Sequence, residues 1–291
     1  MRVAVTGARG LLGRTLVPLW RAAGVDVLAW AHADVDVTDR AAVAAAVATA
    51  RPDVIVHLAA WTDVDGAEGA PDRAIAVNRD GTAAVAAAAA QRGAVLAHVS
   101  TDYVLDGSAG RPLPPDGRLA PLGAYARSKA EAEAAVRMAG PWLVVRAGWL
   151  YGPGGPNFVD AMRERAAARQ PVRVVDDQRG APTPVRIVAE ALYGLVAGGA
   201  RGVWHVAAAG EATWWAVARA VFEACGTDPA LVAACTSAEL GRPAPRPAYA
   251  VLDCSATAAR LGVPFPRWDD AVTAYARGGT QAGLGLIRAA A

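Results

Sequence analysis

The stretch Met1-Arg2-Val3-Ala4-Val5-Thr6-Gly7-Ala8-Arg9-Gly10-Leu11-Leu12-Gly13 places a glycine-rich turn directly after a short β-branched segment. In doubly wound folds, the turn between the first strand and the first helix holds the phosphates of a dinucleotide. Gly7 permits the tight turn, Gly10 lets the backbone approach a pyrophosphate, and Gly13 lets helix and strand pack closely. The spacing is GxxGxxG rather than GxGxxG, so a glycine turn in an unrelated nucleotide-binding fold is the alternative. Position favours an NAD(P) site built from Gly7, Gly10, Leu11, Leu12 and Gly13.

The sequence beyond this turn alternates short apolar runs with alanine-rich stretches, which is the pattern of βαβ units. Consecutive apolar residues, as in 54–56, suit strands that are buried on both faces of a parallel sheet. We therefore expect an α/β fold with a doubly wound, Rossmann-like parallel sheet and a smaller, mainly C-terminal substrate-binding cap. Residues 1–150 should form the NAD(P)-binding domain, and residues 151–291 mainly the cap, with some segments returning to the first domain.

The residues from Gly278 onward look like a loosely held tail. Expected strands include 2–6, 25–30, 54–57, 95–99 and 143–146, and expected helices include 39–50 and 74–92.

Composition narrows the classes of partner. The chain has 291 residues, 54% of them hydrophobic, and its 29 basic and 27 acidic side chains nearly cancel. Such a balance offers no strong field for nucleic acid or an anionic membrane. The three cysteines lack CxxC spacing, which argues against a disulfide framework and a zinc site. We expect no bound metal, no nucleic-acid or membrane partner and, since no signal peptide is evident, a cytoplasmic protein.

The end of the second expected strand bears on the choice of dinucleotide. Trp30-Ala31-His32 carries no acidic residue where a carboxylate would read the ribose 2′-hydroxyl of NAD. Arg9 and His32 could face a 2′-phosphate instead, which favours NADPH slightly over NADH, although Arg9 could also be an ordinary solvated side chain. Asp36, followed by Val37, is expected to contact the adenine or to cap the next helix.

A phenol and an ammonium group lie four residues apart in Tyr125-Ala126-Arg127-Ser128-Lys129. On a helix this spacing puts both on one face, and a cation near a tyrosine is expected to lower the pKa of the phenol. Thr101 follows the fourth expected strand, where open parallel sheets bind ligands, and its hydroxyl could stabilise charge that develops on a carbonyl oxygen. The three residues predict ketone or alcohol chemistry with a dinucleotide, against the alternative that Thr101 only ends a strand.

These motifs, with Ala59-Ala60-Trp61-Thr62-Asp63-Val64-Asp65, Val77-Asn78, Ser100-Thr101-Asp102-Tyr103-Val104-Leu105-Asp106-Gly107, Arg146-Ala147-Gly148-Trp149, Asn157-Phe158 and Arg246-Pro247, carry a resemblance. The chain resembles the extended short-chain dehydrogenases/reductases and, within them, the dTDP-4-dehydrorhamnose reductase family. The resemblance implies a catalytic triad, two residues beside the cofactor and a set around the deoxysugar: Thr101, Tyr125 and Lys129; Ala59 and Ala60; and Thr62, Val64, Tyr103, Trp149 and Asn157.

The resemblance also implies the reaction, an NAD(P)H-dependent reduction of the C4 ketone of dTDP-6-deoxy-L-lyxo-4-hexulose to dTDP-L-rhamnose. Tyr103 stands where sugar-nucleotide dehydratases carry an acidic residue, so reduction is favoured over elimination. The alternatives are a 4-ketoreductase for another dTDP-deoxysugar and a non-catalytic NADP-binding regulatory subunit.

Several residues keep two interpretations. Trp149 could stack on the sugar or belong to the core, and Arg246 could hold the substrate diphosphate or form an ordinary ion pair. His57 and His98 are expected to be structural. Some members of the family form magnesium-bridged dimers through a glutamate that is replaced here by Thr15, so the chain is expected to be a monomer or a homodimer without metal.

Overall fold

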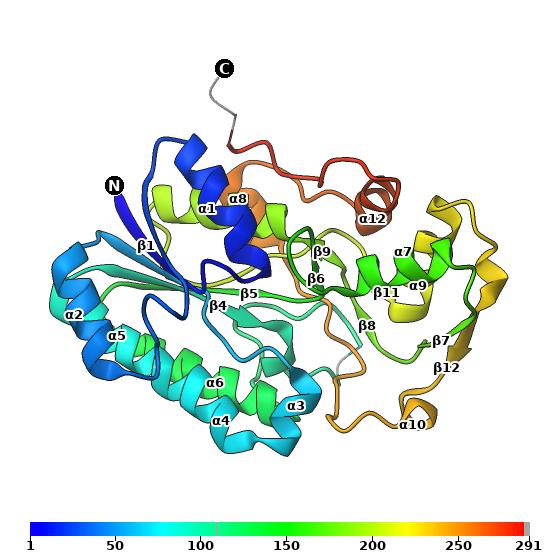
Figure 1. Cartoon of the computed structure of the whole chain (residues 1–291), viewed down its shortest axis with the longest axis horizontal. Coiled ribbons are helices and arrows are strands. Elements are labelled where there is room, and N and C mark those ends of the chain that lie inside the picture. The colour runs from blue at the N-terminus through cyan, green and yellow to red at the C-terminus, as the bar shows by residue number, and fades with distance from the viewer. Residues whose placement is uncertain (109, 288–291) are drawn as a thin grey trace.

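Six parallel strands form the central sheet of the computed structural model, which describes residues 1–108 and 110–287. Their order is β10-β5-β4-β3-β1-β2, so the chain starts inside the sheet and builds outward in both directions. This is the doubly wound, Rossmann-like arrangement that the sequence predicts, and the expectation is confirmed (Figure 1). The strands are β1 (Arg2–Thr6), β2 (Asp26–Trp30), β3 (Val54–His57), β4 (Val95–Thr101), β5 (Trp142–Ala147) and β10 (Gly202–His205).

Helices cover both faces of the sheet (Figure 1). On one face, α1 (Leu11–Ala22) and α8 (Val185–Ala197) bury Leu16 and Leu192 against β1 and β5. On the other face lie α2 (Arg40–Ala50), α5 (Gly81–Arg92) and α6 (Ala124–Arg137). The buried face of α5 is largely alanine, and these small side chains let the helix lie close to the sheet.

The expected helix 74–92 lies within a continuous helical run, 71–92, that contains a π-helical turn. It is divided into α4 (Pro71–Ile75), a π-helical turn η1 (Ala76–Asp80) and α5, and it follows α3 (Val64–Gly69). The π turn contains Asn78, whose side chain bonds the Trp61 backbone and the Ser128 hydroxyl. A widened turn inside a helix commonly marks a functional site, because it re-aims one side chain at the expense of regular hydrogen bonding.

A second group of helices surrounds its own apolar core, to the right in Figure 1. Helices α7 (Phe158–Ala167), α9 (Trp214–Ala224) and α12 (Trp268–Ala276) bury Val159, Phe222 and Val272 there. Short strand pairs border this core. The remaining elements are β6 (Leu150–Tyr151), β7 (Val172–Val175), β8 (Arg179–Gly180), β9 (Thr183–Pro184), β11 (Ala212–Thr213), β12 (Val232–Cys235), η2 (Asp102–Val104), η3 (Pro229–Leu231), α10 (Ser237–Leu240) and α11 (Ser255–Leu261).

The C-terminal segment returns to the sheet side of the molecule. The buried Glu190 carboxylate of α8 accepts hydrogen bonds from the Leu284 and Leu286 N–H groups, and Ile287 is buried. The expectation of a loose tail is therefore wrong for residues 281–287, because Gln281 accepts from the Arg186 N–H and the buried Glu190 carboxylate binds the backbone beyond it. Residues 288–291 lie outside the described residues.

Candidate active site

One large cavity of about 1290 Å³ opens where β1, β3, β4 and β5 end. It begins at the glycine turn, passes the ends of β1 and β3, and reaches α6 and the loop after β5. Parallel sheets bind ligands at this edge because the connecting loops diverge there. The cavity is lined by nearly all residues that the sequence predicts for cofactor and substrate: Gly7, Arg9, Gly10, Leu11, Leu12, Gly13, Asp36, Val37, Ala59, Ala60, Thr62, Val64, Thr101, Tyr103, Tyr125, Lys129 and Trp149.

The glycine turn has the shape that a diphosphate needs. Gly7 has a φ of 65°, and a Cβ there would lie 2.6 Å from the Ala59 nitrogen. A Cβ on Gly13 would lie 2.6 Å from the Ala8 and Gly7 carbonyl oxygens, so helix α1 can approach β1 this closely only without a side chain. Gly10 is the N-cap of α1 and has no side chain to occupy the N–H groups of the first turn. These N–H groups, at the positive end of the helix, fit an anionic dinucleotide.

The far end of the cavity is lined by the segment that follows β2. Asp36 accepts hydrogen bonds from the Thr38 N–H and hydroxyl at 2.9 and 2.8 Å, and these bonds lower its pKa. Asp39, not Asp36, caps α2 through the Ala41 and Ala42 N–H groups, so the helix-cap interpretation of Asp36 is wrong. His32 also lines the cavity, with its Nδ1 3.7 Å from Asp36 Oδ1.

Thr101, Tyr125 and Lys129 all line the cavity. Thr101 is the last residue of β4, while Tyr125 and Lys129 lie on the face of α6 that packs against β4. Lys129 is 2% exposed, and its Nζ donates to the Val99 carbonyl at 2.8 Å and lies 3.1 Å from His98 Nε2. Burial lowers the pKa of Lys129 to about 8. The two groups that accept from the ammonium are uncharged, so they do not neutralise the positive charge that Lys129 brings to the cavity wall.

The pKa of Tyr125 differs from the expectation. Burial, together with the charge of Asp102, raises the pKa of the phenol to about 12, and a hydrogen bond with Thr101 opposes this rise. The expected lowering by Lys129 does not occur, because the Lys129 Nζ is directed to His98 and Val99. A phenol with a raised pKa stays protonated at neutral pH, which is the form that a proton donor requires.

Four residues of the site are given no role in it by the sequence, although Asn78 and Asp102 lie in stretches that carry the resemblance. Asn78 accepts from the Trp61 N–H at 2.8 Å and donates to Ser128 Oγ at 2.8 Å, so it ties the loop after β3 to α6. An asparagine within an alanine-rich helical stretch was the available signal, since asparagine is a poor helix former. The other three are His98, Asp102 and Trp214, whose contacts with the site only the fold reveals.

Beneath the cavity, His57 is fully buried and joins Thr6 to Thr82, at 2.7 and 3.0 Å. The Thr82 hydroxyl donates to the Asn78 carbonyl, so it accepts from His57 Nε2, and His57 Nδ1 accepts from Thr6. Thr6 Oγ1 in turn accepts from the Ala59 N–H at 3.3 Å. His57 is thus a neutral structural residue that supports the cavity wall.

Two tryptophans form the wall on the cap side. The ring centroids of Trp149 and Trp214 lie 3.6 Å apart, and the two rings are stacked with an interplanar angle of 7°. Trp149 has a φ of 52°, and its buried Nε1 has no hydrogen-bond partner among the described residues. Both rings line the cavity, so one interpretation of Trp149 does not exclude the other: it packs on Trp214 and also faces the ligand space.

Asn157 and Arg246 are not among the residues that line the cavity. Asn157 caps α7 by accepting from the Asp160 N–H, and it donates to the Gly152 carbonyl at 2.9 Å. The structure gives its side chain this capping role, which differs from the direct sugar contact that the resemblance implies.

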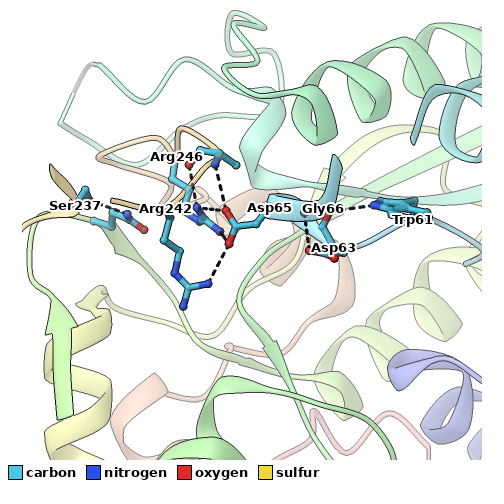
Figure 2. Close-up of polar contacts among 9 residues, drawn as sticks. Trp61, Asp63, Asp65, Gly66, Ser237, Arg242 and Arg246 are labelled. Atoms are coloured by element: carbon cyan, nitrogen blue, oxygen red, sulfur yellow. Dashed lines mark hydrogen bonds and ion pairs between the residues drawn. The ribbon is translucent and has the colours of Figure 1, made fainter. Parts of the chain in front are cut away.

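Arg246 forms the ion pair that the sequence analysis gave as an alternative. Figure 2 shows the Asp65 carboxylate between Arg246 and Arg242, with each guanidinium 3.0 Å away. The Ala244 N–H adds a third donor at 3.2 Å. Burial opposes the ionisation of Asp65, but the bonds from Arg246 and Arg242 prevail and lower its pKa to about 2. The cluster joins α3 to the loop after α10, next to Tyr103, whose hydroxyl Arg246 also reaches.

In the described part of the chain, no helix is both long enough and apolar enough to cross a membrane. Within the same residues, no group of histidine, cysteine, aspartate or glutamate side chains has an arrangement that would hold a metal ion.

Comparison with known proteins places this geometry in a family. Residues 1–279 match the family model of the RmlD substrate binding domain. A dTDP-4-dehydrorhamnose reductase of Streptomyces griseus is 45% identical over 94% of this chain and 92% of its own length. A dTDP-4-keto-6-deoxy-D-glucose reductase of Streptomyces niveus is 41% identical over 94% of this chain and 95% of its own. The crystal structure of dTDP-4-dehydrorhamnose reductase from Bacillus anthracis, solved in complex with NADP, superposes with a TM-score of 0.89 at 32% identity and covers 93% of this chain and 96% of that chain. The chain belongs to the dTDP-4-dehydrorhamnose reductase family, whose model is that of the RmlD substrate binding domain.

Proposed function

We propose that the protein is an NADPH-dependent oxidoreductase that reduces the C4 ketone of dTDP-6-deoxy-L-lyxo-4-hexulose to the alcohol of dTDP-L-rhamnose. The single observation that carries this proposal is that Thr101, Tyr125 and Lys129 line the same cavity as the glycine turn. The relative from Bacillus anthracis binds NADP in the same fold, which supports the choice of cofactor.

The glycine turn and the N-terminus of α1 would hold the diphosphate of the dinucleotide, with Ala59 and Ala60 beside it. Arg9 and His32 would face a 2′-phosphate at the adenosine end. When bound, the cofactor supplies the hydride for C4. Lys129 would hold the ribose next to the nicotinamide through its ammonium group, which His98 and Val99 keep in place.

Tyr125 gives its proton to the oxygen of the ketone as that oxygen becomes an alkoxide. Its pKa of about 12 keeps the phenol protonated before the reaction. Thr101 polarises the carbonyl through a hydrogen bond that strengthens as charge develops on the oxygen. Both side chains line the cavity, where one ketone oxygen could accept a hydrogen bond from each.

The sugar would lie between Thr62, Val64 and Tyr103 on one side and Trp149 on the other. An indole face suits the apolar face of a deoxysugar ring. We propose that the helices around the second core, α7, α9 and α12, act as the cap that excludes water from the hydride transfer. Arg246, at the edge of this space, can reach a diphosphate only by sharing its guanidinium with Asp65.

A second candidate is the reduction of a different dTDP-4-keto sugar. A specific observation favours keeping it, since relatives at 41% and 42% identity carry the names of a dTDP-4-keto-6-deoxy-D-glucose reductase and a probable dTDP-4,6-dihydroxy-2-methyloxan-3-one 4-ketoreductase. The triad is common to both candidates, and the residues around the sugar would decide between them.

The test is the loss of NADPH absorbance with a panel of dTDP-4-keto sugars, with product stereochemistry determined by NMR. Tyr125→Phe should abolish nearly all turnover and leave NADPH affinity nearly unchanged. Tyr193→Phe is the matched control, because Tyr193 packs edge-on against Trp20 on the far side of the sheet. Retained turnover in Tyr125→Phe would refute the assigned proton donor, and a chain that binds NADPH without reducing any sugar of the panel would refute the function.

A further inference from the structure

Asp102 is a buried carboxyl group in the reaction cavity that the mechanism above does not use. It begins η2 directly after Thr101, is 3% exposed and lines the cavity. Gly148 lies against its carboxylate oxygens so closely that a Cβ at position 148 would overlap them. The fold therefore reserves space for this side chain beside the catalytic residues.

The hydrogen bonds of Thr101 create a conflict with its proposed role. Thr101 Oγ1 lies 2.9 Å from Asp102 Oδ1 and accepts from the Tyr103 N–H at 3.2 Å. A hydroxyl group has one proton to donate. If Asp102 is a carboxylate, which can only accept, the Thr101 proton goes to it and the substrate ketone meets the lone pairs of Thr101.

The conflict disappears when the carboxyl group carries the proton. We propose that Asp102 works as a carboxylic acid that donates a hydrogen bond to Thr101 Oγ1 and thereby frees the Thr101 proton for the ketone oxygen. This inference rests on the proposed function, since it assumes that Thr101 polarises the ketone. Asp102 is thus a positioning residue: it acts through Thr101, and its own proton stays on the carboxyl group throughout the reaction.

The surroundings of Asp102 favour the neutral form. The ionisable groups in the surrounding wall include Tyr125 and Lys129 from α6 and Tyr103 from η2, with Arg246 beyond Tyr103. Both cations are directed elsewhere, Lys129 to His98 and Val99 and Arg246 to Asp65. Asp102 is left with hydroxyl and backbone donors, and burial raises its pKa to about 7 against these bonds.

A neutral Asp102 has a second effect on the reaction. When Asp102 is ionised, its negative charge raises the pKa of Tyr125 and also opposes the negative charge that develops on the ketone oxygen. Protonation removes this repulsion at the same time as it orients Thr101. Both effects predict that turnover is highest where Asp102 is protonated and falls as it ionises.

The test compares the pH profile of kcat in the wild-type enzyme with those of Asp102→Asn and Asp102→Leu. Asparagine can donate to Thr101 at every pH, and leucine cannot donate at all. We expect wild-type kcat to fall about tenfold per pH unit above the pKa of Asp102. Asp102→Asn should remove this decline and leave the one at higher pH that belongs to Lys129, while Asp102→Leu should be slow at every pH. Asp106→Asn is the control and should keep the wild-type profile, because Asp106 is a half-buried aspartate of the same segment that does not line the cavity.

An infrared difference spectrum gives a readout independent of turnover. A carbonyl band of a protonated carboxylic acid should be present at pH 6 in the wild-type enzyme and absent from folded Asp102→Asn.

Two outcomes would overturn the inference: an Asp102→Asn profile that declines as the wild type does, or no carboxylic acid band at pH 6. Thr101→Val separates this inference from the proposed function. It should lower kcat by about 100-fold, and a variant with full turnover would instead refute the role of Thr101.

Discussion

The buried ion pair between Glu133 and Arg146 offers the sharpest test of the forces that hold the catalytic helix. Both side chains are 1% exposed, and the guanidinium binds the carboxylate through two bonds of 2.8 Å. Arg146 also donates to the Pro115 carbonyl at 2.9 Å, and its Nη1 lies 3.3 Å from His205 Nε2. Because Glu133 follows Lys129 by one turn, the pair fastens α6 to β5 beneath the reaction cavity.

Glu133→Gln removes the negative charge and leaves the arginine cation buried. The loss of one partner of such a pair costs about 3–5 kcal/mol, a large share of a stability of about 5–15 kcal/mol. Urea unfolding followed by tryptophan fluorescence measures the difference. The matched control is Glu131→Gln on the same helix, where the Glu131 side chain is 47% exposed and lies 3.3 Å from Arg79. We expect this change to cost less than about 1 kcal/mol.

The double replacement Glu133→Leu with Arg146→Met completes the experiment. It removes both charges together, and we expect it to recover most of the loss, since apolar residues can replace a buried pair. If Glu133→Gln cost no more than Glu131→Gln, the reasoning that the buried charge governs the position of α6 would be refuted.

Three further predictions follow from single sites. Asp65→Asn should lower the free energy of unfolding at pH 7 by about 1–2 kcal/mol, because the folded protein lowers the pKa of Asp65 from 3.8 to about 2. This difference between wild type and variant should vanish as the pH falls from 4 to 2. Urea unfolding measures it, and an equal difference at pH 2 would contradict the prediction. Burial lowers the pKa of His57 to about 3 and that of His205 to about 4, so the unfolded chain binds protons at these histidines before the folded protein does. The free energy of unfolding should therefore fall by up to about 1.4 kcal/mol per pH unit for each histidine as the pH drops below 6.5. A urea midpoint that stays constant from pH 7 to 5 would show that the folded protein accepts these protons. Gly7→Ala should weaken NADPH binding, measured by fluorescence titration, more than Gly24→Ala does. Gly24 also has a positive φ, 79°, but a Cβ added there would meet open space. Equal losses of affinity in the two variants would assign the effect to backbone strain alone.

The strands and the motifs were readable from the sequence because their signals are local. A strand buried on both faces must be apolar at successive positions, and a phosphate turn must be free of side chains at the positions of Gly7, Gly10 and Gly13. The four-residue spacing of Tyr125 and Lys129 likewise fixes their common face on a helix. Each of these features is determined by a segment of about a dozen residues. The doubly wound sheet, the glycine turn and the Tyr125–Lys129 pair could therefore be predicted from the sequence.

Tertiary structure alone decided what each polar group does. Asp65 meets Arg246 across 181 positions of sequence, and Trp149 meets Trp214 across the seam with the second core. Lys129 turned out to bind His98 rather than to lower the pKa of Tyr125. The strength of a charge and the direction of a hydroxyl proton depend on burial and on which donors and acceptors the fold brings together, and local sequence carries no record of either.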